Sequence, residues 1–165
     1  MTRIAVLGLG NGVLSDDTVG LRVAERVEAR LPGARMPDGV EVAVRQDEAG
    51  GWDVLDEAEG FDAVVLVDAS TLEPMAPGEL RWYEGPAFLS ARLGGPHSTD
   101  LWTALEYGRR NGLHVPDEIH VLGIGVEDVL TFSEQCTPAV TAAIEPAASA
   151  VLERVGEIAR RRVQG

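Results

Sequence analysis

The stretch Ala63-Val64-Val65-Leu66-Val67-Asp68 decides the fold, because five apolar residues in a row are ended abruptly by an acid. A continuous apolar run of this length is typical of a central parallel strand that helices cover on both faces. We therefore expect a sheet built around residues 63–68, and the flanking segments indicate how it is completed.

Strand and helix patterns alternate on both sides of this run. Residues 3–8 form a second apolar run that ends at glycine, and residues 40–44 alternate apolar and polar side chains. The alternation predicts a three-layer α/β/α sandwich around a five-stranded, mostly parallel twisted sheet, with residues 1–165 as one domain. Further strands are predicted at 79–83, at an edge of the sheet, and at 119–124, and helices at 17–31, 51–59, 99–110 and from 137 onward.

Composition excludes several classes of function. The 165 residues carry a net charge of −13, and all 14 basic residues are arginine. A chain without lysine cannot form a Schiff base, build a P-loop or use a serine–lysine pair. The acidic balance argues against nucleic acid as a partner, and no apolar run is long enough to suggest a membrane. Cys136 is the single cysteine and has no evident histidine partner, so we expect neither a disulfide nor a thiol nucleophile, and a reducing, cytoplasmic compartment.

The turn after the first predicted strand holds the first candidate site, within Gly8–Gly20. It begins as G-x-G, but the third glycine of a dinucleotide-binding turn would fall at Val13, which argues against a nucleotide site. Asp16 and Asp17 follow, and two carboxylates would repel a phosphate at the start of a helix. Helix capping explains such acids. A role as general base is the alternative for either, with Asp16 near the cap and Asp17 facing the cleft.

Two further candidates are expected at the same edge of the sheet, where the carboxyl ends of parallel strands gather. Asp68 ends the apolar run, and an acid there is costly to bury unless it is hydrogen-bonded or bound to a cation. His97 follows a stiff Gly-Pro turn, whereas His114 and His120 are predicted to be ordinary surface residues. Together, Asp17, Asp68 and His97 would form a ligand set of two carboxylate oxygens and one imidazole nitrogen, with open coordination positions. Such a set suits zinc or nickel.

Four motifs follow one another over nearly the whole chain: Ile4–Gly20 with its G-x-G-N turn, the strand ending at Val67-Asp68-Ala69, the Pro96-His97 turn and Thr137–Pro146. In this order they resemble the hydrogenase maturation endopeptidases. The resemblance implies a phosphorylase/hydrolase-like sandwich and a cytoplasmic enzyme, for which we expect a monomer. It also implies that the substrate is the large-subunit precursor of a nickel–iron hydrogenase, from which a C-terminal extension is removed after nickel insertion.

The resemblance assigns site residues position by position. Nickel carried by the substrate would be recognised by Asp17, Asp68 and His97, and the first of these positions is commonly glutamate in the family. Expected substrate-binding residues are Asn11, Asp47 and Glu48. The last two stand in a segment where relatives often carry a glycine–threonine element.

Two other functions stay open at this point. The same ligand set could hold zinc or another divalent cation permanently, as in a resident-metal hydrolase. The chain could instead be a nickel-dependent chaperone that binds the precursor without cutting it, for which the shortened side chain of Asp17 is slight support. In the endopeptidase hypothesis nickel acts as recognition element and template, and the general base is Asp16 or Asp17.

Overall fold

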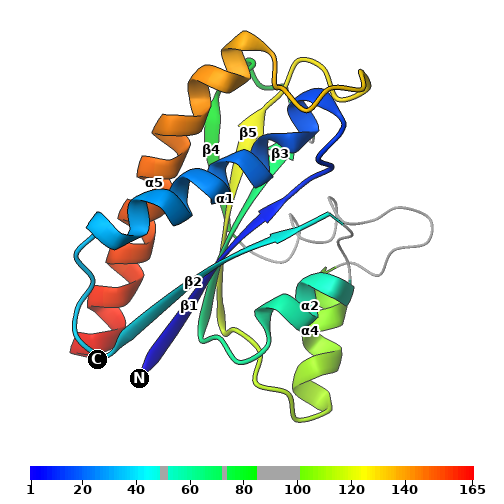
Figure 1. The fold of residues 1–165 in the computed structure, drawn as a ribbon. Helices are drawn as coiled ribbons and strands as arrows, with labels where there is room; N and C mark the ends of the chain where they lie inside the picture. The colour runs from blue at the N-terminus through cyan, green and yellow to red at the C-terminus, as the bar shows by residue number, and fades with distance from the viewer. Residues whose placement is uncertain (49–51, 72–73, 85–100) are drawn as a thin grey trace.

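The computed structural model describes residues 1–48, 52–71, 74–84 and 101–165 (Figure 1). Within these ranges the strands form one sheet in the order β2-β1-β3-β5-β4. Strand β4 is antiparallel to β5, and the other neighbouring pairs are parallel. The predicted five-stranded, mostly parallel sheet is therefore confirmed. The strands are β1 (Thr2–Leu9), β2 (Val40–Asp47), β3 (Ala63–Ser70), β4 (Leu80–Glu84) and β5 (Glu118–Gly125).

Helices cover both faces of the sheet (Figure 1). Successive residues of a strand point to opposite faces, and β1 illustrates the result: Ile4 and Val6 pack in the cluster beneath α1 and α5, whereas Ala5 and Leu7 pack in the cluster beneath α2 and α4. This gives the predicted three layers. The helices are α1 (Val19–Arg30), α2 (Trp52–Ala58), α4 (Leu101–Arg110) and α5 (Pro138–Gln164), with single 3-10 turns η1 (Ser15–Thr18) and η2 (Leu31–Gly33).

Strand β3 occupies the centre of the sheet, between β1 and β5, and all eight of its residues are buried. The apolar run at 63–68 thus marks the most enclosed strand, as its composition predicts. Strand β4 lies at an edge, also as predicted. The expected start of a helix at Thr99 falls outside the described residues, and α4 is described from Leu101.

Close contact between α1 and the sheet depends on Gly20. A Cβ atom on Gly20 would overlap the carbonyl oxygens of Leu9 and Val67, at the carboxyl ends of β1 and β3. Gly8 meets the same helix, because a Cβ there would overlap the carbonyl oxygen of Gly20 and the side chain of Ala24. Two glycines therefore let the amino-terminal turn of α1 lie directly on the strand ends.

We expect Gly20→Ala to lower the free energy of unfolding by about 3 kcal/mol, because neither overlapping carbonyl can move without disturbing the sheet. Urea denaturation measures the change. Gly33→Ala is the matched control, since nothing lies within 4 Å of a Cβ at Gly33, and its expected effect is within about 0.5 kcal/mol. Equal stability of the two variants would show that α1 does not need this contact.

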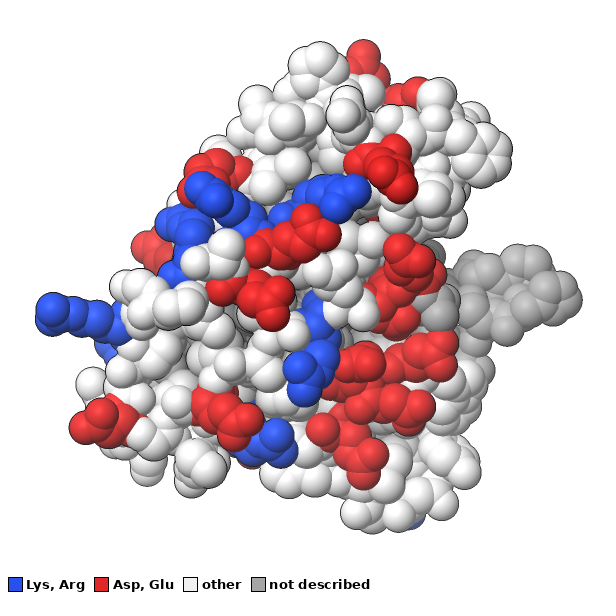
Figure 2. All heavy atoms as spheres, viewed as in Figure 1, with Lys and Arg blue, Asp and Glu red and all other residues white. Residues whose placement is uncertain are grey.

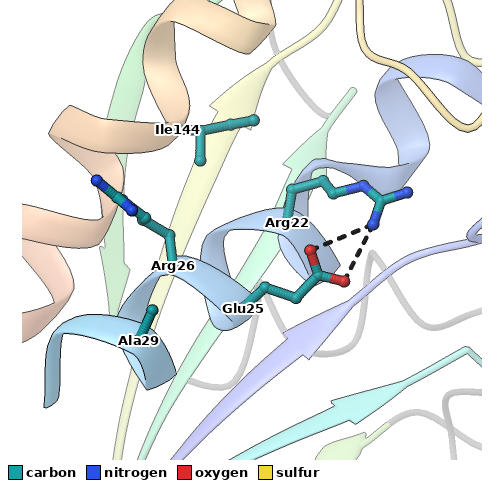
Figure 3. A pocket seen from close by; sticks show the side chains of 5 residues that line it. All are labelled: Arg22, Glu25, Arg26, Ala29 and Ile144. Atoms are coloured by element: carbon teal, nitrogen blue, oxygen red, sulfur yellow. Dashed lines mark hydrogen bonds and ion pairs between the residues drawn. The ribbon is translucent and has the colours of Figure 1, made fainter. Parts of the chain in front are cut away.

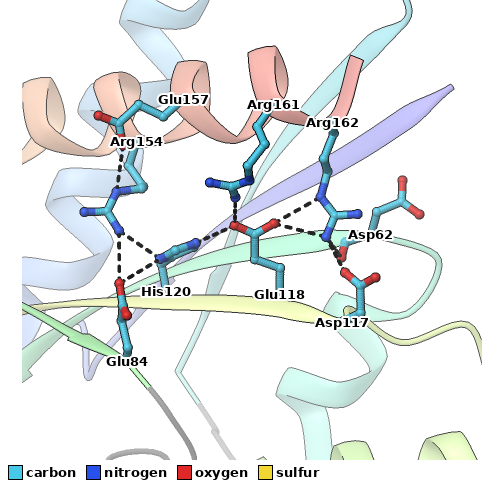
Figure 4. A network of polar contacts seen from close by, with 9 residues as sticks. All are labelled: Asp62, Glu84, Asp117, Glu118, His120, Arg154, Glu157, Arg161 and Arg162. Carbon is cyan, nitrogen blue, oxygen red and sulfur yellow. Dashed lines mark hydrogen bonds and ion pairs between the residues drawn. The ribbon is translucent and has the colours of Figure 1, made fainter. Parts of the chain in front are cut away.

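His120 lies in β5 with only 12% of its side chain exposed, which corrects the prediction that it is an ordinary surface residue. Its Nδ1 atom is 2.9 Å from Nη1 of Arg154, and its Nε2 atom is 2.7 Å from Oε1 of Glu118 (Figure 4). A guanidinium can only donate, so Nδ1 accepts and the ring proton on Nε2 is donated to Glu118. His120 thus links α5 to β5.

The arginines near the end of α5 take part in the same network (Figure 4). Arg161 and Arg162 both donate to Glu118, and Arg162 also donates to Asp117. Burial alone would raise the pKa of Glu118, but hydrogen bonds from His120 and Arg161 hold it below its ordinary value. These contacts attach the last turns of α5 to the start of β5. The predicted site lies at the other end of the strands.

Candidate active site

The predicted acids Asp17 and Asp68 lie at the same edge of the sheet. Asp68 stands near the carboxyl end of β3, opposite Gly123 of β5, and is 8% exposed. Asp17 belongs to η1, which leads directly into the turn of α1 that Gly20 seats on the ends of β1 and β3. Asp17 is half-buried there. The topology therefore brings together two carboxylates that are 51 positions apart in the sequence.

Asp16 has a different environment from its neighbour, because its side chain is fully buried. Its two carboxylate oxygens accept hydrogen bonds from four donor groups, all on residues more than 110 positions away. The backbone N–H groups of Glu127 and Asp128 donate to Oδ2, each at 2.9 Å. Thr137 donates its N–H to Oδ1 at 2.6 Å, and its hydroxyl lies 2.9 Å from both oxygens.

These hydrogen bonds keep Asp16 ionised. Burial alone would raise its pKa, but the bonds from Asp128, Glu127 and Thr137 outweigh burial, and the pKa lies below its ordinary value of 3.8. The charge is held by fixed donors, and both oxygens are occupied. The geometry therefore favours a structural role for Asp16, in which it joins η1 to residues 126–137, the segment that connects β5 to α5.

The three predicted substrate-binding residues lie at the adjoining ends of β1 and β2. The side-chain oxygen of Asn11 accepts the N–H of Val13 at 3.1 Å, which shapes the turn after β1. Asp47 is largely buried, and its carbonyl accepts the N–H of Gly10. Glu48 places its carboxylate against Gly12, where a Cβ would overlap it. The structure brings these residues together beside the turn that leads to Asp17.

Acidic side chains extend from this point over the neighbouring helix. Figure 2 shows carboxylates gathered on the side of the molecule where β2 ends and α2 lies. The exposed residues there include Glu48, Asp53 and Asp56, for which the described part of the chain provides no ion pair. This agrees with the acidic character that the sequence predicts for the segment after β2.

His97 lies outside the described residues, so the Asp17–Asp68–His97 ligand set stays a prediction. Among the residues that the structure does describe, no group of three or more histidine, cysteine, aspartate or glutamate side chains is arranged to hold a metal ion. The donor chemistry is nevertheless suitable, because two carboxylates at one sheet edge supply two of the three predicted ligands.

Cys136 is held beside η1 as a packing residue. Its Sγ atom is 3.3 Å from the hydroxyl of Thr18 and 3.8 Å from the carbonyl oxygen of Ser15. Burial raises the pKa of the Cys136 thiol, and a thiol that is hard to ionise is a poor nucleophile. This agrees with the expectation from sequence that Cys136 is not catalytic.

A shallow groove lies elsewhere, between α1 and α5 (Figure 3). Its polar side chains are already engaged: Arg22 lies 3.0 Å from a carboxylate oxygen of Glu25, and Arg26 pairs with Glu145. The groove contains neither Asp17 nor Asp68. We therefore assign the candidate site to the sheet edge and not to this groove.

Sequence reasoning placed Thr137 in a motif but missed the rest of residues 126–137 as part of the site. Their backbone supplies the donors that fix Asp16, and Phe132 forms an isolated antiparallel bridge with Leu14. The N–H of Ser133 also donates to the carbonyl of Val13 at 2.9 Å. One signal was available, namely apolar residues in a loop between acids, at Leu130 and Phe132. In Figure 1 this segment, yellow to orange, lies beside η1.

Comparison with known proteins gives a consistent result, although no family model matches the chain. The chain is 32% identical to the hydrogenase 2 maturation protease of Escherichia coli K12, over 94% of this chain and 92% of the relative. It is 28% identical to the hydrogenase expression/formation protein HoxM of Azotobacter vinelandii, over 94% and 73%. The solved structure of the hydrogenase maturating endopeptidase HybD from E. coli matches with a TM-score of 0.75 at 30% identity, over 94% and 93%.

None of the described helices combines the length and apolar character that a membrane span needs.

Proposed function

The chain belongs to the hydrogenase maturation proteases, and on this premise we propose that it removes a C-terminal extension from the large-subunit precursor of a nickel–iron hydrogenase. Peptidase activity follows from membership of the family. The observation that carries the proposal is the similarity to the E. coli protease at 32% identity, which extends over almost the whole of both chains. The two carboxylates at one edge of the sheet support it.

In this proposal Asp17, Asp68 and His97 recognise nickel that the precursor already holds. The nickel is cargo of the substrate, and it acts as a template that places the bond to be cut beside the strand ends. Two carboxylate oxygens and one imidazole nitrogen suit a borderline divalent ion such as nickel. The carboxylate of Asp68 lies near the carboxyl end of the fully buried strand β3, where parallel strands gather their functional groups.

Asp17 is the general base that we propose for the hydrolysis. The side chain of its neighbour Asp16 is fully buried, whereas Asp17 is half-buried at the sheet edge. The water oxygen bonds to the carbonyl carbon while Asp17 accepts a water proton, and the carbon–nitrogen bond then breaks as the amine nitrogen receives a proton. The reaction uses one water for each peptide bond and needs no other co-reactant.

We expect the protein to cut nickel-loaded precursor at least about 100-fold faster than nickel-free precursor, since the metal positions the scissile bond. Mass spectrometry of both precursors before and after incubation measures the difference. Equal cleavage of both would overturn recognition through nickel. A zinc ion that survives dialysis, together with equal cleavage, would instead indicate a hydrolase with a resident metal.

A second outcome separates cutting from holding. If the precursor keeps its mass but co-elutes with the protein only when nickel is loaded, the chain is a nickel-dependent chaperone and the endopeptidase proposal fails. Asp38→Asn serves as the control for substitutions of the proposed site residues, because Asp38 is an exposed acid before β2 that no part of the proposal uses.

A further inference from the structure

Three apolar side chains are strongly exposed beside the candidate site. Leu130 and Phe132 are each 83% exposed and Val13 is 48% exposed. Among the large apolar residues that the structure describes, only Met1 at the chain terminus is more exposed than the first two. Val13 precedes Leu14, which bridges to Phe132, so the three side chains belong to two joined loops. We call Val13, Leu130 and Phe132 the apolar ledge.

Hydrogen bonds stabilise the loop that carries the ledge. The carboxylate of Asp128 accepts the N–H of Leu130 at 3.0 Å and that of Thr131 at 2.9 Å. A hydrogen bond from the Thr131 side chain, together with these two, lowers the pKa of Asp128. Asp16 also anchors the loop, because its carboxylate accepts the N–H groups of Glu127 and Asp128. Because its backbone groups are engaged, the loop presents Leu130 and Phe132 to solvent already ordered, as in a preformed binding surface.

The loop that carries the ledge contacts η1, the element in which Asp17 lies. Asp16, which anchors the loop, is the neighbour in sequence of Asp17, the proposed general base. The N–H of Asp16 also donates to the carbonyl of Asp128 at 2.8 Å. The element η1, which carries Asp17, is therefore in direct contact with the loop that carries Leu130 and Phe132.

Charge restricts the kind of polypeptide that the ledge fits. Residues 126–137 contain the acids Glu127, Asp128 and Glu134 and no arginine. Glu127 and Glu134 are exposed. Figure 2 shows this end of the molecule, at the top of the view, mostly white with separate red side chains. An apolar segment that also carries positive charge is complementary to such a surface.

We propose that the apolar ledge is the docking surface for an apolar, positively charged segment of the hydrogenase precursor next to the bond that is cut. The inference rests on the proposed function and adds the region of the enzyme that determines substrate affinity. In many protein interfaces a few anchor side chains contribute most of the binding energy, and aromatic residues such as Phe132 are enriched at interfaces.

The test is the double variant Leu130→Ser with Phe132→Ser, assayed on nickel-loaded precursor. We expect KM to rise by about 10- to 100-fold and kcat to stay within about twofold of wild type, because the ledge binds the substrate without touching the reacting atoms. Val163→Ser is the matched control, since Val163 is 48% exposed near the end of α5, and its KM should not change. A thermal scan of each variant verifies folding, which an exposed substitution leaves intact.

The salt dependence of kcat/KM tests the charge complementarity between the loop and the precursor separately. In wild type, kcat/KM should fall as salt is raised, and Glu127→Gln with Glu134→Gln should make it less dependent on salt. A KM of the ledge variant within twofold of wild type, or a fall in kcat alone, would overturn the inference. If wild type binds the precursor without cutting it, dissociation constants replace KM and the same comparison applies. Wild type that neither cuts nor binds the precursor would overturn the proposed function and, with it, this inference.

Discussion

Asp17→Asn is expected to lower kcat for precursor processing by about 10²- to 10⁴-fold, because an amide cannot take a proton from water at neutral pH. Asparagine has nearly the size of aspartate, and Asp17 lies half-buried in η1, so the fold should not change. Mass spectrometry of nickel-loaded precursor over time gives the rate. Circular dichroism and the Tm verify that the variant is folded.

Two matched substitutions make this result specific. Asp17→Glu keeps a carboxylate at the site and should retain far more activity than the asparagine variant. Asp38→Asn removes an equal charge at an exposed position before β2, and its rate should stay within about twofold of wild type. Full activity of Asp17→Asn would remove Asp17 from the chemistry, whereas a loss shared by Asp38→Asn would point to net charge as the cause.

Asp16→Ala is expected to lower the free energy of unfolding by about 3–5 kcal/mol, because it leaves three backbone N–H groups and the hydroxyl of Thr137 without their acceptor. In a domain of this size the loss corresponds to a fall in Tm of roughly 10 °C. Thermal and urea unfolding measure both quantities. A change below about 1 kcal/mol would contradict the structural role of Asp16.

The stabilisation by Asp16 also depends on pH in a defined direction. Its folded-state pKa lies below the ordinary value of 3.8, so the ionised form is favoured in the folded protein. The contribution is therefore fully present above the unfolded pKa and is lost as pH falls through the folded pKa. The difference in stability between wild type and Asp16→Ala should be constant near neutral pH and shrink below pH 3.8. A difference that grows with acid would have the wrong sign.

Hydrophobic patterning was sufficient to predict the architecture. The apolar run at 63–68 became the buried central strand, and β4 lies at an edge as its short run suggested. Such predictions succeed because strands and helices bury residues with different periods, and these periods can be counted along a chain. The location of Asp17 and Asp68 at the carboxyl ends of strands follows from the same topology.

The surroundings of His120 and of residues 126–137 could not be predicted from hydrophobic patterning. Nothing near His120 in the sequence indicates that Arg154, 34 positions later, will lie against its ring. Exposure of Leu130 and Phe132 is equally hidden, because apolar residues in a sequence are ordinarily assigned to the core. Contacts between distant segments determined these environments.

The adjacent acids Asp16 and Asp17 illustrate which properties the sequence determined and which only the tertiary structure decided. The sequence alone determined the α/β sandwich, the sheet edge that carries the acids and the family that the chain resembles, because periodicity and motifs are local properties. Only the tertiary structure decided that Asp16 is buried and anchors the loop before α5 while Asp17 is half-buried. The physical reason is that the groups that hold Asp16, at Glu127, Asp128 and Thr137, are more than 110 residues away and approach only when β5 joins the sheet.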